Sequence, residues 1–208
     1  IKYLQDEKYL AKTEYVPVET NLDIKNIFSQ KAINFELNRI KNGQDLSESF
    51  LKHIGADLTR ANIIIELIKK ESLNAKNKII VFTSSVDSAE TIYSILFLEG
   101  INSACITSNT NPILRREYIE QFKTIDSGLN ILLNYGVLTT GFDAPKANVA
   151  IIARPTQSVS LYSQMVGRVM RGPRAKGKDK CKIITVKDPI HGFRDMGESF
   201  KFWEDIWK

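Results

Sequence analysis

Hydrophobic and polar positions follow two alternating patterns from about residue 58 onward. Short apolar runs predict buried strands at 79–82, 103–106, 129–134, 148–155 and 181–186. Apolar residues at helical spacing predict helices between these runs, at 58–73, 88–99, 112–123 and 160–171. Strands that alternate with helices need crossover connections, so we predict a doubly wound α/β fold with a mostly parallel sheet and helices on both faces.

The segments on either side of this core have a different pattern. Residues 1–58 carry polar residues at helical spacing, with strand-like alternation only near "TEYVPV", and predict a helical inter-domain connector without a core of its own. Residues 59–188 are the predicted α/β domain. Residues 189–208 predict a C-terminal helical extension that packs through aromatic side chains, namely Phe200, Phe202, Trp203 and Trp207.

The overall composition is that of a globular protein with a buried core, since 43% of the 208 residues are hydrophobic and 25% are charged. The net charge of +5 is unevenly distributed, because residues 168–182 contain one acidic residue, Asp179, and seven basic ones. The basic residues are Arg168, Arg171, Arg174, Lys176, Lys178, Lys180 and Lys182. Such a stretch favours a polyanion such as nucleic acid, but a solubilising surface loop has the same composition.

Cysteine usage and the chain ends give further expectations. Cys105 and Cys181 lie in or beside apolar runs, which indicates reduced buried thiols and a cytoplasmic location. No run approaches the roughly 18 apolar residues that a membrane helix needs, so we expect no membrane contact. The chain begins with Ile1 rather than Met, and we expect it to be part of a longer protein. His53 and His191 have no ligand-spaced companions, so we assign no metal site.

Three loops that follow predicted strands are rich in hydroxyl groups, glycine or backbone donors. The loops span residues 83–85, 107–110 and 135–145. Because the carboxyl ends of parallel strands lie at one edge of a sheet, we expect these loops at the edge where ligands bind. Hydroxyl groups and loop amides are the groups that contact a sugar-phosphate backbone without reading bases. Each Ser or Thr taken alone is equally well explained as a helix N-cap.

One segment, "QMVGRVMRGP" at 164–173, combines a glutamine with two arginines. The spacing i, i+4 and i+7 places Gln164, Arg168 and Arg171 on one face of a predicted helix, and we expect this face at the loop edge of the sheet. Gly167 removes side-chain bulk beside these residues. Two guanidinium groups suit a polyphosphate, although a solvated helix face with ordinary surface arginines has the same pattern.

In order along the chain, "IIVFTSS", "TTGFDAP" and "QMVGRVMRGP" resemble motifs IV, V and VI of the second RecA-like motor domain of superfamily 2 helicases and translocases. The resemblance covers about residues 58–188. Within the superfamily, these segments are similar to those of DEAD/DEAH-type helicases related to restriction-enzyme motor subunits and to RadD-type helicases. The chain departs from the DEAD-box pattern at Gln164, Met165 and Tyr135, where His, Arg and Thr are usual. These departures favour DNA over RNA as the nucleic acid.

The resemblance implies roles for individual residues. Arg168 and Arg171 would be arginine fingers that reach the γ-phosphate of ATP on the first motor domain, and Gln164 would sense that phosphate. Gly141 and Asp143 would approach the nucleotide and its ribose. The positions expected to contact the nucleic-acid backbone are Ser84, Thr107 and Thr139.

The sequence has no "GxxxxGK[ST]" phosphate loop and no acidic magnesium motif after a strand, so we expect no ATP hydrolysis by this chain alone. The resemblance implies that ATP and Mg²⁺ are held mainly by an N-terminal RecA-like domain of the same polypeptide. Two alternatives stay open. One is a stand-alone nucleic-acid-binding module of the same fold without ATPase activity, and the other is a small-molecule nucleotide-binding α/β domain.

Overall fold

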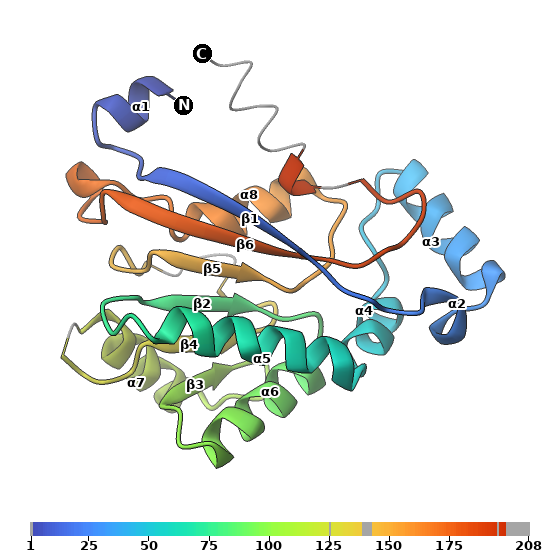
Figure 1. Ribbon diagram of the computed structural model, residues 1–208, viewed down its shortest axis with the longest axis horizontal. Coiled ribbons are helices and arrows are strands. Elements are labelled where there is room, and N and C mark those ends of the chain that lie inside the picture. Colours follow the sequence, from blue (N-terminus) through green and yellow to red (C-terminus); the bar gives the residue numbers. More distant parts are fainter. Residues whose placement is uncertain (1, 125, 139–142, 195, 199–208) are drawn as a thin grey trace.

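A six-stranded sheet forms the centre of the protein in the computed structural model, which describes residues 2–124, 126–138, 143–194 and 196–198. The strands lie in the order β1-β6-β5-β2-β4-β3, and each neighbouring pair is parallel (Figure 1). Their bounds are β1 Lys12–Glu19, β2 Ile79–Phe82, β3 Ser103–Ile106, β4 Ile131–Asn134, β5 Val149–Ile152 and β6 Lys180–Lys187. The prediction of a parallel α/β sheet is confirmed.

Helices cover both faces of the sheet. The elements are α1 Lys2–Asp6, α2 Ile24–Ile27, α3 Gln30–Lys41, α4 Glu48–Gly55, α5 Leu58–Ser72, α6 Val86–Leu98, α7 Pro112–Lys123, α8 Val159–Gly167 and the 3₁₀ turn η1 Pro173–Ala175. Successive side chains of a strand point to opposite faces. In β2, Ile79 and Val81 accordingly pack with α5 and α6, whereas Ile80 and Phe82 pack with α7 and α8. This two-sided core is the doubly wound arrangement that the sequence predicts.

Strand β1 lies within the segment predicted to be a helical connector, at the stretch near "TEYVPV" where the sequence has strand-like alternation. The connector was not predicted to join the sheet. β1 pairs with β6 along its full length, from Lys12 opposite Lys180 to Glu19 opposite Lys187. It is an edge strand whose side chains are half-buried or exposed, and it tolerates Pro17, which cannot donate a ladder hydrogen bond. The connector therefore contributes directly to the sheet.

Residues 22–55, which we call the helical unit, build a small core that the sequence did not predict. Their apolar cluster consists of Leu22, Ile24, Phe28, Leu46, Phe50, Leu51, Ile54 and, from beyond β6, Ile190. The rings of Phe28 and Phe50 stack with 4.1 Å between centroids. In Figure 1 the helices α2, α3 and α4 of this unit lie together beyond the carboxyl ends of the strands. The helical unit thus covers part of the edge where the three predicted loops gather.

The two cysteines are free thiols, as expected, with Cys181 buried and Cys105 half-buried. Burial raises the pKa of the Cys105 thiol to about 12, so this group stays protonated at neutral pH. The four aromatic residues at 200, 202, 203 and 207, predicted to lie on a C-terminal helix, fall outside the described residues.

Candidate functional site

Helix α8 ends earlier than the sequence predicts. Its last residue is Gly167, Arg168 caps it, and Arg171 forms an antiparallel bridge with Leu10 instead of continuing the helix. Backbone hydrogen bonds to the segment before β1 replace the helical ones from residue 170 onward. The expectation that one helical face carries Gln164, Arg168 and Arg171 is therefore wrong for Arg171.

Arg171 and Asp143, from two of the three sequence motifs, contact each other. Arg171 Nη1 lies against Asp143 Oδ1, and 31% and 65% of the two side chains are exposed. This ion pair is therefore accessible from outside the domain. Gly141, the other residue predicted to approach the nucleotide, lies outside the described residues.

Gln164 and Arg168 differ in their exposure. Gln164 is exposed on α8, whereas Arg168 at the helix end is half-buried. Burial lowers the pKa of the Arg168 guanidinium, but arginine stays protonated in proteins. A charge that is partly shielded from water interacts more strongly with a nearby phosphate than a fully solvated one does.

The arginine segment lies at the opposite edge of the sheet from the one expected. The carbonyl of Met170 accepts a hydrogen bond from the N–H of Ala11, and that of Asp179 accepts one from Lys12, so the segment sits at the amino ends of β1 and β6. The reason is the direction of α8, which starts after the carboxyl end of β5 and runs back along the sheet (Figure 1). The expectation that the arginines lie at the loop edge of the sheet is wrong.

Ser84, at the carboxyl end of β2, is completely buried below the helical unit. A methyl group added at Gly55, the last residue of α4, would lie 2.5 Å from Ser84 Oγ. A hydrogen bond between this hydroxyl and a nucleic-acid phosphate therefore does not fit the structure, because α4 covers the hydroxyl.

Thr107, at the end of β3, is also buried, with 1% of the residue exposed. Its Oγ1 accepts a hydrogen bond from the N–H of Asn109 at 3.2 Å, and its own N–H donates to Thr110 Oγ1 at 2.9 Å. These bonds close a tight turn and do not cap a helix, because the N-cap of α7 is Asn111. Ser108 and Asn109 are exposed at the tip of this turn, and Thr139 lies outside the described residues.

The loop that contains Asp143 leads from one edge of the sheet to the other. At its start, the N–H of Leu138 donates to Asn134 Oδ1 at the carboxyl end of β4. At its end, the N–H of Asn148 donates to the carbonyl of Lys78 at the amino end of β2. Of the described residues of this loop, Leu138 therefore lies at the loop edge and Asn148 at the edge that carries the arginines.

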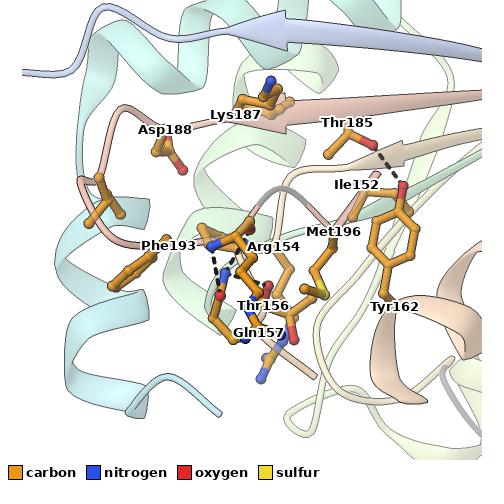
Figure 2. A pocket seen from close by; sticks show the side chains of 14 residues that line it. Ile152, Arg154, Thr156, Gln157, Tyr162, Thr185, Lys187, Asp188, Phe193 and Met196 are labelled. Carbon is orange, nitrogen blue, oxygen red and sulfur yellow. Dashed lines mark hydrogen bonds between the residues drawn. The ribbon is translucent and has the colours of Figure 1, made fainter. Parts of the chain in front are cut away.

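A cavity of about 120 Å³ opens at the carboxyl ends of β5 and β6 (Figure 2). The Arg154 guanidinium, which lines it, lies 5.1 Å from the ring centroid of Tyr135. The side chain of Gln157 bonds the backbone of Arg194 twice, since Oε1 accepts from the N–H at 2.9 Å and Nε2 donates to the carbonyl at 3.0 Å. Asp188 also lines the cavity.

Sequence reasoning missed this polar cavity. The available signal was the polar residues that directly follow two predicted strands, in "ARPTQ" and "VKDP". The carboxyl edge of the sheet therefore holds a second accessible polar surface besides the turn at 107–110.

Much of the basic stretch 168–182 is used in contacts within the chain. Arg174 pairs with Glu7 at 2.9 Å, and Lys182 pairs with Glu71 at 3.0 Å. Lys178 Nζ donates to a backbone carbonyl and to an asparagine side chain. Burial, with the nearby charge of a second lysine, lowers the pKa of Lys178. These contacts weaken the prediction that the whole stretch binds phosphates.

Within the described ranges, no group of three or more His, Cys, Asp or Glu side chains is arranged to hold a metal ion. Nor does any helix of the described chain have the length and apolar character needed to cross a membrane.

Comparison with known proteins identifies the family. The model of the helicase conserved C-terminal domain matches residues 59–173. The chain is 29% identical over 184 residues to the ATP-dependent helicase IRC3 of Saccharomyces cerevisiae, covering 86% of this chain and 24% of that protein. It is 26% identical over 156 residues to the ATP-dependent RNA helicase DRS1 of Candida glabrata, covering 72% of this chain and 21% of that one. The chain thus spans less than a quarter of the length of these curated relatives.

A solved structure shares the fold. It is a fragment of the HsdR subunit of a type I restriction enzyme from Vibrio vulnificus, with a TM-score of 0.57 and 20% identity over 95% of this chain and 34% of that one. The family model covers more than half of this chain and includes β2, the Asp143 loop and the Arg171 segment. The protein therefore belongs to the helicase conserved C-terminal domain family.

Proposed function

We propose that this chain is the second motor domain of an ATP-dependent helicase or translocase that acts on nucleic acid, with DNA favoured over RNA. In this role it supplies arginine fingers to ATP and contacts the nucleic-acid backbone through loops. ATP and Mg²⁺ would be held mainly by an N-terminal RecA-like domain of the same polypeptide. The free thiols Cys105 and Cys181 fit the reducing cytoplasm as the location.

The observation that carries the proposal is the contact between the partly exposed Arg171 and the exposed Asp143. The two residues are 28 positions apart, from 143 to 171, and both fall within the stretch matched by the family model. A partly exposed guanidinium beside an exposed carboxylate offers a donor fork for phosphate oxygens and an acceptor for ribose hydroxyls. A nucleoside triphosphate presents both kinds of group.

The chemistry of phosphoryl transfer explains why such arginines matter. Negative charge spreads over the oxygens of the transferring phosphoryl group, and an arginine finger stabilises it, accelerating hydrolysis by roughly 10³–10⁵-fold. Arg171 would exchange Asp143 for the γ-phosphate when the two motor domains close. Hydrolysis would then depend on closure, which couples ATP turnover to domain motion.

The nucleotide and the nucleic acid would occupy opposite edges of the sheet. The arginines lie at the amino edge, whereas the exposed turn residues Ser108 and Asn109 and the polar cavity lie at the carboxyl edge. We assign the contact with the nucleic-acid backbone to this turn and to Thr139 in the linking loop rather than to the buried hydroxyls of Ser84 and Thr107. Residues 135–148 would connect the two sites.

The fingers can be tested in the protein that carries both motor domains. Arg171→Ala and Arg168→Ala should lower the turnover of ATP by about 10³-fold, because each removes charge that stabilises the transferring phosphoryl group. Binding to single-stranded DNA should stay unchanged, since the arginines lie at the other edge. Turnover is measured with and without single-stranded DNA, and with RNA of the same sequence.

Arg116→Ala is the matched control, because Arg116 is an exposed arginine of α7 outside the candidate site. Normal turnover in both Arg171→Ala and Arg168→Ala would remove the finger role. Equal or stronger stimulation by RNA would overturn the preference for DNA.

A further inference from the structure

The backbone around Arg171 is fixed by residues 7–11, which we call the strap. Leu10 and Arg171 face each other in an antiparallel bridge. On one side of this bridge the N–H of Ala11 donates to the carbonyl of Met170 at 2.8 Å. On the other side the N–H of Gly172 donates to the carbonyl of Tyr9 at 2.9 Å. The strap therefore fixes the backbone of both residues that flank Arg171.

Two glycines allow this close packing. A methyl group added at Gly172 would collide with the backbone carbonyl of Lys8 in the strap. A methyl group added at Gly177, where the chain runs back past Arg171, would collide with the backbone carbonyl of Arg171. The N–H of Lys178 donates to that same carbonyl at 3.1 Å. Arg171 thus lies between the strap and the returning chain, with no room for a side chain at either glycine.

The strap is also held at its start, by residues outside the predicted motifs. Arg174 Nη1 pairs with Glu7 Oε2 at 2.9 Å, and its guanidinium lies 5.2 Å from the ring centroid of Tyr9. Lys8 has a left-handed backbone, with φ of 61°, and its carbonyl accepts from the N–H of Arg174 at 3.0 Å. A non-glycine residue keeps this conformation only where its surroundings enforce it. The strap therefore has one defined conformation on the arginine segment.

We propose that the strap positions Arg171 for the transferring phosphoryl group, so that Glu7, Tyr9 and Gly172 are positioning residues of the motor. This inference rests on the proposed function. Its physical basis is that a displacement of about 1 Å of a catalytic group can cost about 10²-fold in rate. The Arg171 side chain is long and partly exposed, so its location depends on a rigid backbone.

The decisive experiment reverses the charges of the outer contact in the protein that carries both motor domains. Glu7→Arg and Arg174→Glu should each lower kcat for ATP by about two- to fivefold, the range expected for an exposed ion pair. The double variant, with both charges exchanged, should restore kcat. KM for ATP and the affinity for single-stranded DNA should not change, because the ATP-binding domain and the carboxyl edge are untouched.

Two further measurements separate positioning from stability. Gly172→Ala should reduce kcat by about 10²-fold through the collision with the strap. In the 208-residue chain, the amides of Gly172 and Arg174 should exchange with solvent faster in Glu7→Arg and return to parental rates in the double variant. A kcat that stays parental in Glu7→Arg and Gly172→Ala, or a double variant that fails to recover, would overturn the role of the strap.

The outcome for the strap is distinguishable from that for the proposed function. If Arg171→Ala abolishes turnover while the strap variants retain it, the finger stands and the strap is refuted. If Arg171→Ala retains turnover, the finger role of Arg171 fails. Parental exchange at Gly172 and Arg174 in Glu7→Arg then refutes the positioning contact separately.

Discussion

Arg60 and Asp188 form a buried ion pair at the point where three strands end. Arg60 Nε lies 2.9 Å from Asp188 Oδ1, and each side chain is 1% exposed. Arg60 Nη2 also donates to the carbonyl of Ala153, directly after β5, and Thr20, directly after β1, donates to Asp188, directly after β6. Within the described part of the chain, Arg60 Nη1 and Asp188 Oδ2 have no hydrogen-bond partner. The pair ties helix α5 to the strands at an incompletely satisfied site.

Removing one partner of this ion pair should strongly destabilise the protein, whereas replacing both partners with apolar residues should not. Asp188→Ala should lower the free energy of unfolding by about 3–5 kcal/mol, because it leaves the Arg60 charge buried without its partner. Arg60→Met combined with Asp188→Leu should be less destabilised than Asp188→Ala, since neither charge then remains. Urea denaturation of the 208-residue chain measures both. A loss below about 1 kcal/mol in Asp188→Ala would contradict the argument.

At the level of elements, Gly55 lets α4 approach the start of α6. A methyl group there would lie 2.5 Å from Ser84 Oγ and 3.0 Å from both Ser85 Oγ and Ser88 Cβ. Alanine is intrinsically favoured over glycine in a helix by about 1 kcal/mol, and overpacking costs about 1–3 kcal/mol. Because these atoms are buried, the steric term should dominate here.

Gly55→Ala should therefore destabilise the protein, and adding Ser84→Ala should recover part of the loss by removing the nearest atom. The matched control is Gly167→Ala at the end of α8, where no atom lies within 4 Å of the added methyl group and a small gain is expected. Thermal unfolding compares the three variants. A Gly55→Ala protein as stable as Gly167→Ala would show that α4 does not pack as described.

The sequence predicted those elements whose environment is uniform. Strands β2, β4 and β5 are buried at every position, so their apolar runs are unmistakable. Strand β1 was recognised only as strand-like alternation near "TEYVPV" and not as part of the sheet, because an edge strand is only half-buried and Pro17 interrupts its alternation. The end of α8 was missed because a contact 161 positions away in sequence, from Leu10 to Arg171, replaces the helical bonds. Local pattern carries no information about such pairing.

For the whole molecule, the candidate residues could be named from sequence motifs but not placed. Periodicity gave no sign that Ser84 lies below Gly55, because the helical unit was not predicted to have a core. The placement of the arginines at the amino edge follows from the direction of α8 across the sheet, a tertiary feature. The order of the motifs therefore predicted the family and named Arg171 and Asp143 as candidate site residues. Which hydroxyl groups are inaccessible depends on burial, which the motifs do not reveal.

The helical unit should be the less stable part of the molecule. Helix α3 contributes one buried residue, Glu36, whereas the similarly long α5 contributes six. Local opening needs less free energy where few contacts are buried. Hydrogen exchange of the 208-residue chain should therefore be about 100-fold faster in α3 than in α5 or β2. Equal protection of α3 and α5 would mean that the helical unit opens only with the sheet.

The pairing of β1 with β6 brings together partners such as Thr13 and Cys181, which are 168 positions apart. During synthesis on the ribosome, β1 emerges before the other five strands of the sheet and has no neighbour in the sheet until the chain has grown through Lys187. Strands this far apart in sequence pair late and slowly, because the entropy cost of closing the long loop between them must be overcome before their contacts form. The arginine segment and the strap meet in that same final event, so a nascent chain acquires its arginine-bearing edge only once translation of the sheet is complete.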